Sequence, residues 1–185
     1  MDKKEFEKFK RDYALKTLVQ EAQFGQWLRF FFYLNHKLNE EYDTIYQMSY
    51  YVKLYELLTE GLEYAKMVLS NLSIEISKGK VDWYNILIEG LSEIKVQMSD
   101  EEFEFLEYKR HSASHIFQNK YEVSIKKDGK RKTTYKNGET LDDIADKFKE
   151  LLIKHGSDKH FDIYLTSKLY PMISSLHSTL QKNGA

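Results

Sequence analysis

The sequence predicts an all-α protein, an antiparallel helical bundle with one small β-hairpin. One proline and eight glycines in 185 residues leave few points at which a helix must end. Apolar residues recur every three or four positions along most of the chain, which is typical of helices that pack in a core. Only around Asp128-Gly129 do apolar and polar residues alternate, which indicates β-strands. The Asp-Gly dipeptide favours a tight turn between two such strands. We expect a single domain, residues 1–185, because this length suffices for one core.

Two long amphipathic segments open the chain. The first is expected to be helical from about residue 3 to about residue 38. The second has a seam whose members are spaced by three and four positions: Met48, Tyr51, Tyr55, Leu58, Leu62, Ala65, Leu69, Leu72 and Ile76. Tyrosines and leucines at this spacing indicate a bundle core rather than a cofactor site.

Further helices are expected in the second half of the chain. Residues 81–97 place their apolar side chains on one face, and Ser99 with Glu102 has the pattern of a capping box that begins the next helix. A β-hairpin follows at about residues 121–135. The C-terminal helices are expected over about residues 140–182, with a kink or a restart at the chain's one proline.

The composition excludes several classes of function. Lys and Arg total 28 against 29 for Asp and Glu, so no basic field covers the whole protein and any anion site must be local. The absence of cysteine excludes disulfides, thiolate nucleophiles and cysteine-ligated zinc. The N-terminus is charged and the aromatic run "WLRFFFYL" is interrupted by Arg29, so we expect no membrane span and a cytoplasmic location.

The helix that begins at the capping box contains the candidate catalytic residues. Arg110 is followed after four residues by His115, and His111 lies between them. On a helix His111 and His115 share a face, and Ser112 and Ser114 keep the surroundings small and polar. We expect both serines to contact the substrate of this site.

The spacing of Arg110 and His115 is not rare by itself. An arginine followed after four to six residues by a histidine is expected by chance roughly 0.4 times in a sequence of this composition. Arg29 and His36 meet the same rule, and we interpret them as chance because they lie in an apolar helix with no basic cluster after it.

A basic cluster does follow Arg110, since seven basic and two acidic residues lie between positions 120 and 136. Five of the basic residues flank the expected turn and are candidates for binding RNA phosphates: Lys126, Lys127, Lys130, Arg131 and Lys132. The alternative is that these residues only protect strand edges from pairing with other chains.

These residue types suit the cleavage of RNA. RNA carries its own nucleophile, the 2′-hydroxyl, so cleavage requires a group that transfers protons near pH 7 and a fixed positive charge at the phosphate. Histidine and arginine supply these without a metal or a cofactor. Arg110 lies about 140° from His115 around a helix, so one complete site is expected to need two chains. A metal ion shared by His111 and His115 is the alternative, but the sequence offers no clear third ligand.

The segment "KRHSASHIFQNKYEVSIKKDGKRKTTYKNGETLDDIADKFKELL", residues 109–152, resembles the end of a HEPN domain. The likeness rests on "RH" followed by "ASH", the aromatic residue after it, the Asp-Gly turn and the helix start "ETLDDI". It implies an all-α bundle of HEPN type with a β-hairpin inserted after the motif helix. It also implies a homodimer in which two motifs face each other, and metal-independent endoribonuclease activity in toxin–antitoxin or antiviral defence systems.

Carried over from the family, Arg110 and His115 are the catalytic pair. His111 takes the polar position after the arginine, where asparagine is commoner. Some HEPN toxins have a tyrosine two residues after the histidine, which a nucleotidyltransferase antitoxin modifies. Phe117 stands there in this chain, so any antitoxin protein is expected to act by binding. The alternative function is a non-catalytic HEPN-like module that binds RNA, a nucleotide or another protein.

Overall fold

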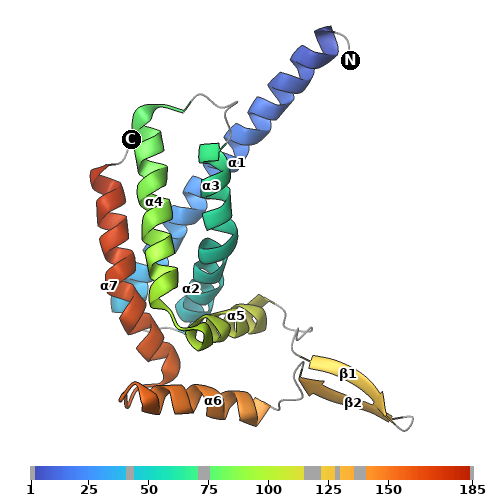
Figure 1. Cartoon of the computed structure of the whole chain (residues 1–185), viewed down its shortest axis with the longest axis vertical. Helices are drawn as coiled ribbons and strands as arrows, with labels where there is room; N and C mark the ends of the chain where they lie inside the picture. Colours follow the sequence, from blue (N-terminus) through green and yellow to red (C-terminus); the bar gives the residue numbers. More distant parts are fainter. Residues whose placement is uncertain are drawn as a thin grey trace.

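A computed structural model of the protein describes residues 3–40, 44–70, 76–114, 122–127, 130–135 and 141–183, some of them by their backbone alone. Long helices run side by side in a bundle, so the predicted all-α class is confirmed (Figure 1). The other helices lie across one end of this bundle. No helix within the described ranges has both the length and the apolar character needed to span a membrane.

In chain order the elements are α1 (Lys3–Glu40), α2 (Thr44–Glu56), the π-helical turn η1 (Leu57–Gly61), α3 (Leu62–Ser70), α4 (Lys78–Gln97), α5 (Asp100–Ser114), β1 (Glu122–Lys127), β2 (Lys130–Tyr135), α6 (Leu141–Lys154) and α7 (Phe161–Lys182). The bundle consists of α1, the run from α2 to α3, α4 and α7, while α5 and α6 cross its lower end in the view of Figure 1. The N-terminal end of α1 extends beyond the other helices.

The expected first helix and the helix expected over residues 81–97 are both found, as α1 and α4. Of the two outcomes expected at Pro171, a kink or a restart, the restart is excluded because α7 continues through this residue. Pro171 is exposed, whereas Leu169 and Ile173 on either side of it are buried. Proline lacks the backbone N–H that would donate a hydrogen bond within the helix. The packing of α7 on both sides of Pro171 therefore keeps the helix continuous without that bond.

The seam predicted for the second segment is largely correct. Tyr51, Leu58, Leu62 and Ala65 are all buried in the core. Tyr55, Leu69 and Ile76 are half-buried, Leu72 lies outside the described residues, and Met48 is exposed over 47% of its surface. The buried stripe also includes residues outside the expected seam, namely Tyr50, Leu54, Leu57 and Val68. The π-helical turn η1 fits one extra residue into this stretch, which rotates the buried face relative to a regular α-helix.

The strands β1 and β2 pair antiparallel, with Lys126 opposite Arg131 and Lys127 opposite Lys130. Four of the five basic residues singled out in the sequence thus lie in adjacent pairs at the same end of the hairpin.

The capping box that the sequence predicts begins α5. The Glu102 N–H donates to Ser99 Oγ at 3.2 Å, and the Ser99 N–H donates to Glu102 Oε2 at 2.9 Å. Glu102 is fully buried, and Lys168 of α7 donates to its two carboxylate oxygens at 2.7 and 2.9 Å. One carboxylate therefore both starts α5 and ties it to α7.

Removal of this carboxylate is expected to destabilise the fold strongly. Glu102→Ala removes the capping bond and leaves Lys168 without its partner, so we expect a loss of about 3 kcal/mol in the free energy of unfolding. The control is Glu63→Ala, which removes an exposed pair with Lys66 on α3 and is expected to change stability by at most about 0.5 kcal/mol. Urea unfolding followed by circular dichroism measures both, and similar losses in the two variants would contradict the central role of Glu102.

Candidate functional site

Helix α5 contains Arg110 of the candidate site and packs along α2. Phe105 meets Tyr51 edge to face with ring centroids 6.0 Å apart, and Phe103 lies 5.6 Å from Tyr55. These aromatic contacts fix the direction of α5 on the bundle, because ring pairs favour particular geometries. The C-terminal turns of α5, which begin near Arg110, are thereby held at the lower end of α2.

The side chain of Arg110 points back along α5 and over α2. Its guanidinium carbon lies 5.6 Å from the centroid of the Tyr55 ring, within the range of a cation–π contact. The Arg110 Nε atom is buried, and no acceptor within the described part of the chain forms a hydrogen bond with it. A buried donor without an acceptor costs about 1–3 kcal/mol, so an acceptor supplied at this position would be bound favourably.

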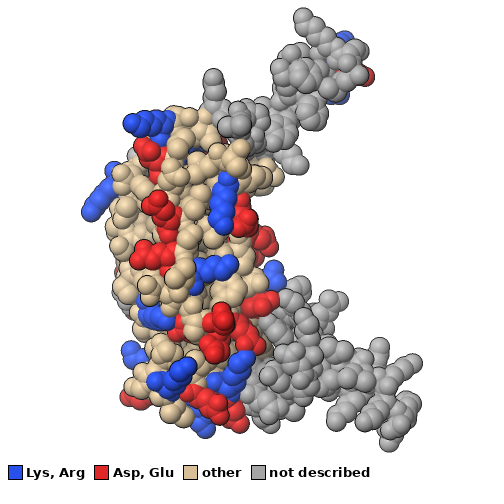
Figure 2. Space-filling model, in the orientation of Figure 1, with Lys and Arg blue, Asp and Glu red and all other residues tan. Residues whose placement is uncertain are grey.

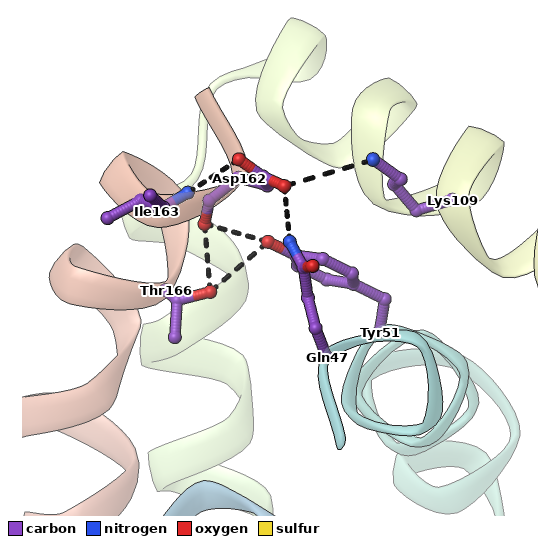
Figure 3. Close-up of polar contacts among 6 residues, drawn as sticks. All are labelled: Gln47, Tyr51, Lys109, Asp162, Ile163 and Thr166. Atoms are coloured by element: carbon purple, nitrogen blue, oxygen red, sulfur yellow. Dashed lines mark hydrogen bonds and ion pairs between the residues drawn. The ribbon is translucent and has the colours of Figure 1, made fainter. Parts of the chain in front are cut away.

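A polar network next to Arg110 joins three helices (Figure 3). Asp162 at the start of α7 accepts hydrogen bonds on its carboxylate from Gln47 of α2 and from the N–H of Ile163, the latter at 2.9 Å. Its backbone oxygen accepts from the hydroxyls of Tyr51 at 2.7 Å and Thr166 at 2.8 Å. These two hydroxyl oxygens lie 3.1 Å apart.

Lys109 connects this network to the motif. Its Nζ lies 4.0 Å from the Asp162 carboxylate and 5.3 Å from the centroid of the Phe105 ring (Figure 3). A carboxylate in the first turn of a helix is also favoured by the helix dipole. Asp162 thus links α5, α2 and α7 to one another, and its contact with α5 is made by the residue that precedes Arg110.

Of the other predicted site residues, the structure describes only the backbone, and one of them lies outside the described residues. The backbone of α5 includes His111, Ser112 and Ser114 in its last turn. His115 lies outside the described residues, so the predicted Arg110–His115 pair stays a prediction. Lys126, Lys127, Lys130, Arg131 and Lys132 lie on β1 and β2, as their backbone shows.

The second arginine–histidine pair lies elsewhere, on α1. Arg29 is exposed, and the exposed His36 side chain faces Glu40, with 3.1 Å between His36 Nε2 and Glu40 Oε1. Nothing in these contacts brings Arg29 and His36 into one site, which agrees with their interpretation as a chance match.

The surface charge around the bundle is mixed. Lys, Arg, Asp and Glu side chains alternate over the described surface in Figure 2, and no large area of that face has a single sign. Within the described ranges, no three His, Asp or Glu side chains come close enough together to hold a metal ion.

Neither the contact of Arg110 with Tyr55 nor the network that Lys109 joins was predicted from the sequence. Tyr55 was assigned to the core seam by its spacing, but it is half-buried and forms the surface under the guanidinium. Asp162 and Gln47 are 115 positions apart, and no local pattern signals their contact.

The chain matches no protein-family model, and no solved structure resembles it closely enough to count as a match.

Two adjacent tyrosines test the network. Tyr51→Phe removes a hydroxyl that bonds to Asp162 and Thr166, and we expect it to lower the free energy of unfolding by about 1–2 kcal/mol. Tyr50→Phe is the matched control, because its hydroxyl is buried with no hydrogen-bond partner in the described structure and burial raises its pKa. Removal of that hydroxyl is expected to be neutral or stabilising by urea unfolding. An equal loss in both variants would contradict the network's contribution.

Proposed function

We propose that the protein is a metal-independent endoribonuclease of the HEPN type, active in the cytoplasm as a homodimer. The observation that carries the proposal is the environment of Arg110. Its guanidinium is held against Tyr55 in the helix that leads to His115, and its buried Nε–H has no acceptor in the described structure. An arginine fixed in this way is suited to bind a charged phosphate without first losing its own side-chain freedom.

The proposed reaction uses the RNA's own hydroxyl. His115 accepts the proton of the 2′-hydroxyl, whose oxygen attacks the adjacent phosphorus. Arg110 stabilises the charge that develops on the phosphate oxygens. The bond to the 5′-oxygen then breaks, and this oxygen takes a proton from a second histidine, His111 or the partner's His115. The products are a 2′,3′-cyclic phosphate and a free 5′-hydroxyl.

A dimer is proposed because one helix does not present Arg110 and His115 on the same side. The surface of α2 beside α5 offers apolar area for such a contact, since 72% of Ile45 and 47% of Met48 are exposed. Exposed apolar side chains near a candidate site favour an interface. A closed two-fold dimer would bring two copies of α5 to one composite site.

The proposal extends to the surroundings of the site. Ser112 and Ser114 contact the RNA next to Arg110, and the basic residues of β1 and β2 bind its phosphates. The activity serves a toxin–antitoxin or antiviral defence system, in which an antitoxin protein silences the enzyme by binding.

A second candidate is a non-catalytic module of the same fold. The contact between Arg110 and Tyr55 favours it, because the guanidinium already has a partner within its own chain. In that case Arg110 binds a nucleotide or a phosphate group of RNA, and no bond is broken.

Substitution of the motif separates the two candidates. Arg110→Ala and His115→Ala are expected to lower the rate of RNA cleavage by about a hundredfold or more, with RNA affinity nearly unchanged. Arg110→Lys should restore little, because lysine lacks the planar fork of arginine. The control pair is Arg29→Ala and His36→Ala, which has the same sequence pattern on α1 and is expected to leave the rate unchanged. Gel assays with 5′-labelled RNA in EDTA measure the rates.

The same experiment tests the composite site. A mixture of the Arg110→Ala and His115→Ala proteins should regain part of the activity if each site combines residues of two chains. Cleavage that persists in both single variants, or that stops in EDTA, would overturn the proposed site. No cleavage of varied RNAs by the intact protein would favour the module.

The basic hairpin is tested by the salt dependence of binding. Replacement of Lys126, Lys127, Lys130, Arg131 and Lys132 by Gln is expected to weaken RNA binding and to reduce the slope of log affinity against log salt, because fewer counterions are released. Fluorescence anisotropy at several salt concentrations measures both quantities. A control replaces three exposed lysines outside the hairpin: Lys66 of α3, Lys78 of α4 and Lys149 of α6. An unchanged slope in the hairpin variant would mean that the hairpin does not contact RNA.

A further inference from the structure

A groove of about 580 Å³ lies between α1, α4 and α7, away from α5. Its walls include five aromatic or heteroaromatic rings: Phe24, Phe32, Trp83, Tyr84 and His177. Its volume falls within the range of about 300–1,000 Å³ that is typical of small-molecule sites. The proposed ribonuclease reaction uses none of these side chains.

The rings form uncharged, flat surfaces. Phe32 and His177 are nearly parallel, with centroids 4.1 Å apart and 8° between their planes. Trp83 stands at 90° to Tyr84, with centroids 5.2 Å apart. Burial lowers the pKa of His177 and raises the pKa of Tyr84, so both side chains are favoured in their neutral forms. Such walls favour a flat aromatic ligand, which stacks on rings of this kind.

Gly25 on α1 leaves space in the same groove. A glycine inside a helix costs about 1 kcal/mol relative to alanine, so its presence calls for a physical reason. Close packing explains Gly90 on α4, where an added Cβ would clash with the side chain of Leu176. At Gly25 an added Cβ would meet nothing within 4 Å. The absence of a side chain there keeps the groove open rather than relieving a contact between helices.

Among the described residues, one positive charge that lines the groove has no carboxylate partner. Lys80 forms an ion pair with Glu21, and these two charges offset each other. Arg29 lies one helical turn after Gly25, and no carboxylate of the described structure pairs with it. An exposed arginine beside an apolar groove is suited to bind a carboxylate or another planar acid group through two hydrogen bonds.

We propose that this groove binds a small planar aromatic compound that carries one negative charge. The ring system stacks between the aromatic walls over Gly25, and the acid group pairs with Arg29. The shape, the rings and Arg29, the one cation of the groove without a carboxylate partner among the described residues, each select for one part of this ligand. The site is independent of the proposed ribonuclease activity.

Titration calorimetry with two probes tests the site. The anionic probe is 1-naphthoate, and the neutral probe of similar shape is 1-naphthalenemethanol. We expect 1-naphthoate to bind the intact protein with a dissociation constant of about 0.1 mM, a usual affinity for a ligand of this size. The neutral probe is expected to bind roughly fivefold more weakly, because it has no charge to pair with Arg29.

Substitutions in the groove identify the place of binding. Gly25→Leu fills the open space and is expected to weaken 1-naphthoate at least tenfold, while the melting temperature stays the same or rises. The control is Gly79→Leu, because Gly79 on α4 is equally open but does not line the groove. Arg29→Gln should weaken 1-naphthoate roughly fivefold and leave the neutral probe unchanged, and Arg29→Lys should retain only part of the affinity, because lysine keeps the charge but lacks the planar fork.

Three results would overturn the proposal. The first is the absence of saturable binding of 1-naphthoate up to about 5 mM. The second is an equal loss of binding in the Gly25→Leu and Gly79→Leu proteins. The third is an Arg29→Gln protein that binds the anionic probe as well as the intact protein does.

Discussion

The buried carboxylate of Glu102 is the contact on which the position of the candidate site depends. It accepts the N–H of Ser99 and so begins α5, and it accepts two hydrogen bonds from Lys168 of α7. A buried ion pair adds little net stability compared with apolar residues, but the loss of one partner is costly. The pair therefore acts as a geometric constraint, because α5 cannot leave α7 without exposing or isolating a charge. The position of Arg110, two turns further along α5, follows from that constraint.

Much of the helical fold could be predicted from the sequence because its signals are local. The capping box at Ser99 and Glu102 lies within four residues, and the apolar spacing of α1 and α4 repeats within one turn. The exceptions have identifiable causes. Met48 was assigned to the core by spacing alone, but the π-helical turn η1 changes which face of the run is buried. Pro171 suggested a break, yet the packed residues on either side of it keep α7 intact.

The candidate site could be predicted only in part, because its residues are brought together by contacts between distant positions. The motif around Arg110 is visible in the sequence, but its partner surface is not. Tyr55 precedes Arg110 by 55 positions, and Lys168 follows Glu102 by 66. Asp162 bonds to Gln47 across 115 positions. A single sequence carries no signal for such pairs, since each depends on how whole helices cross.

The contact between Arg110 and Tyr55 is compatible with both candidate functions, and its geometry explains why. A guanidinium contacts an aromatic ring with the flat face of its own plane. It binds a phosphate through the N–H groups at the edge of that plane. The ring can therefore hold the arginine without using its N–H groups, of which the buried Nε–H has no acceptor in the described structure. What distinguishes an enzyme from a binding module is then the neighbouring proton-transfer group and not the arginine itself. Under the proposed function, Tyr55 holds the arginine in either case, and catalysis would depend on a histidine reaching the same phosphate as Arg110.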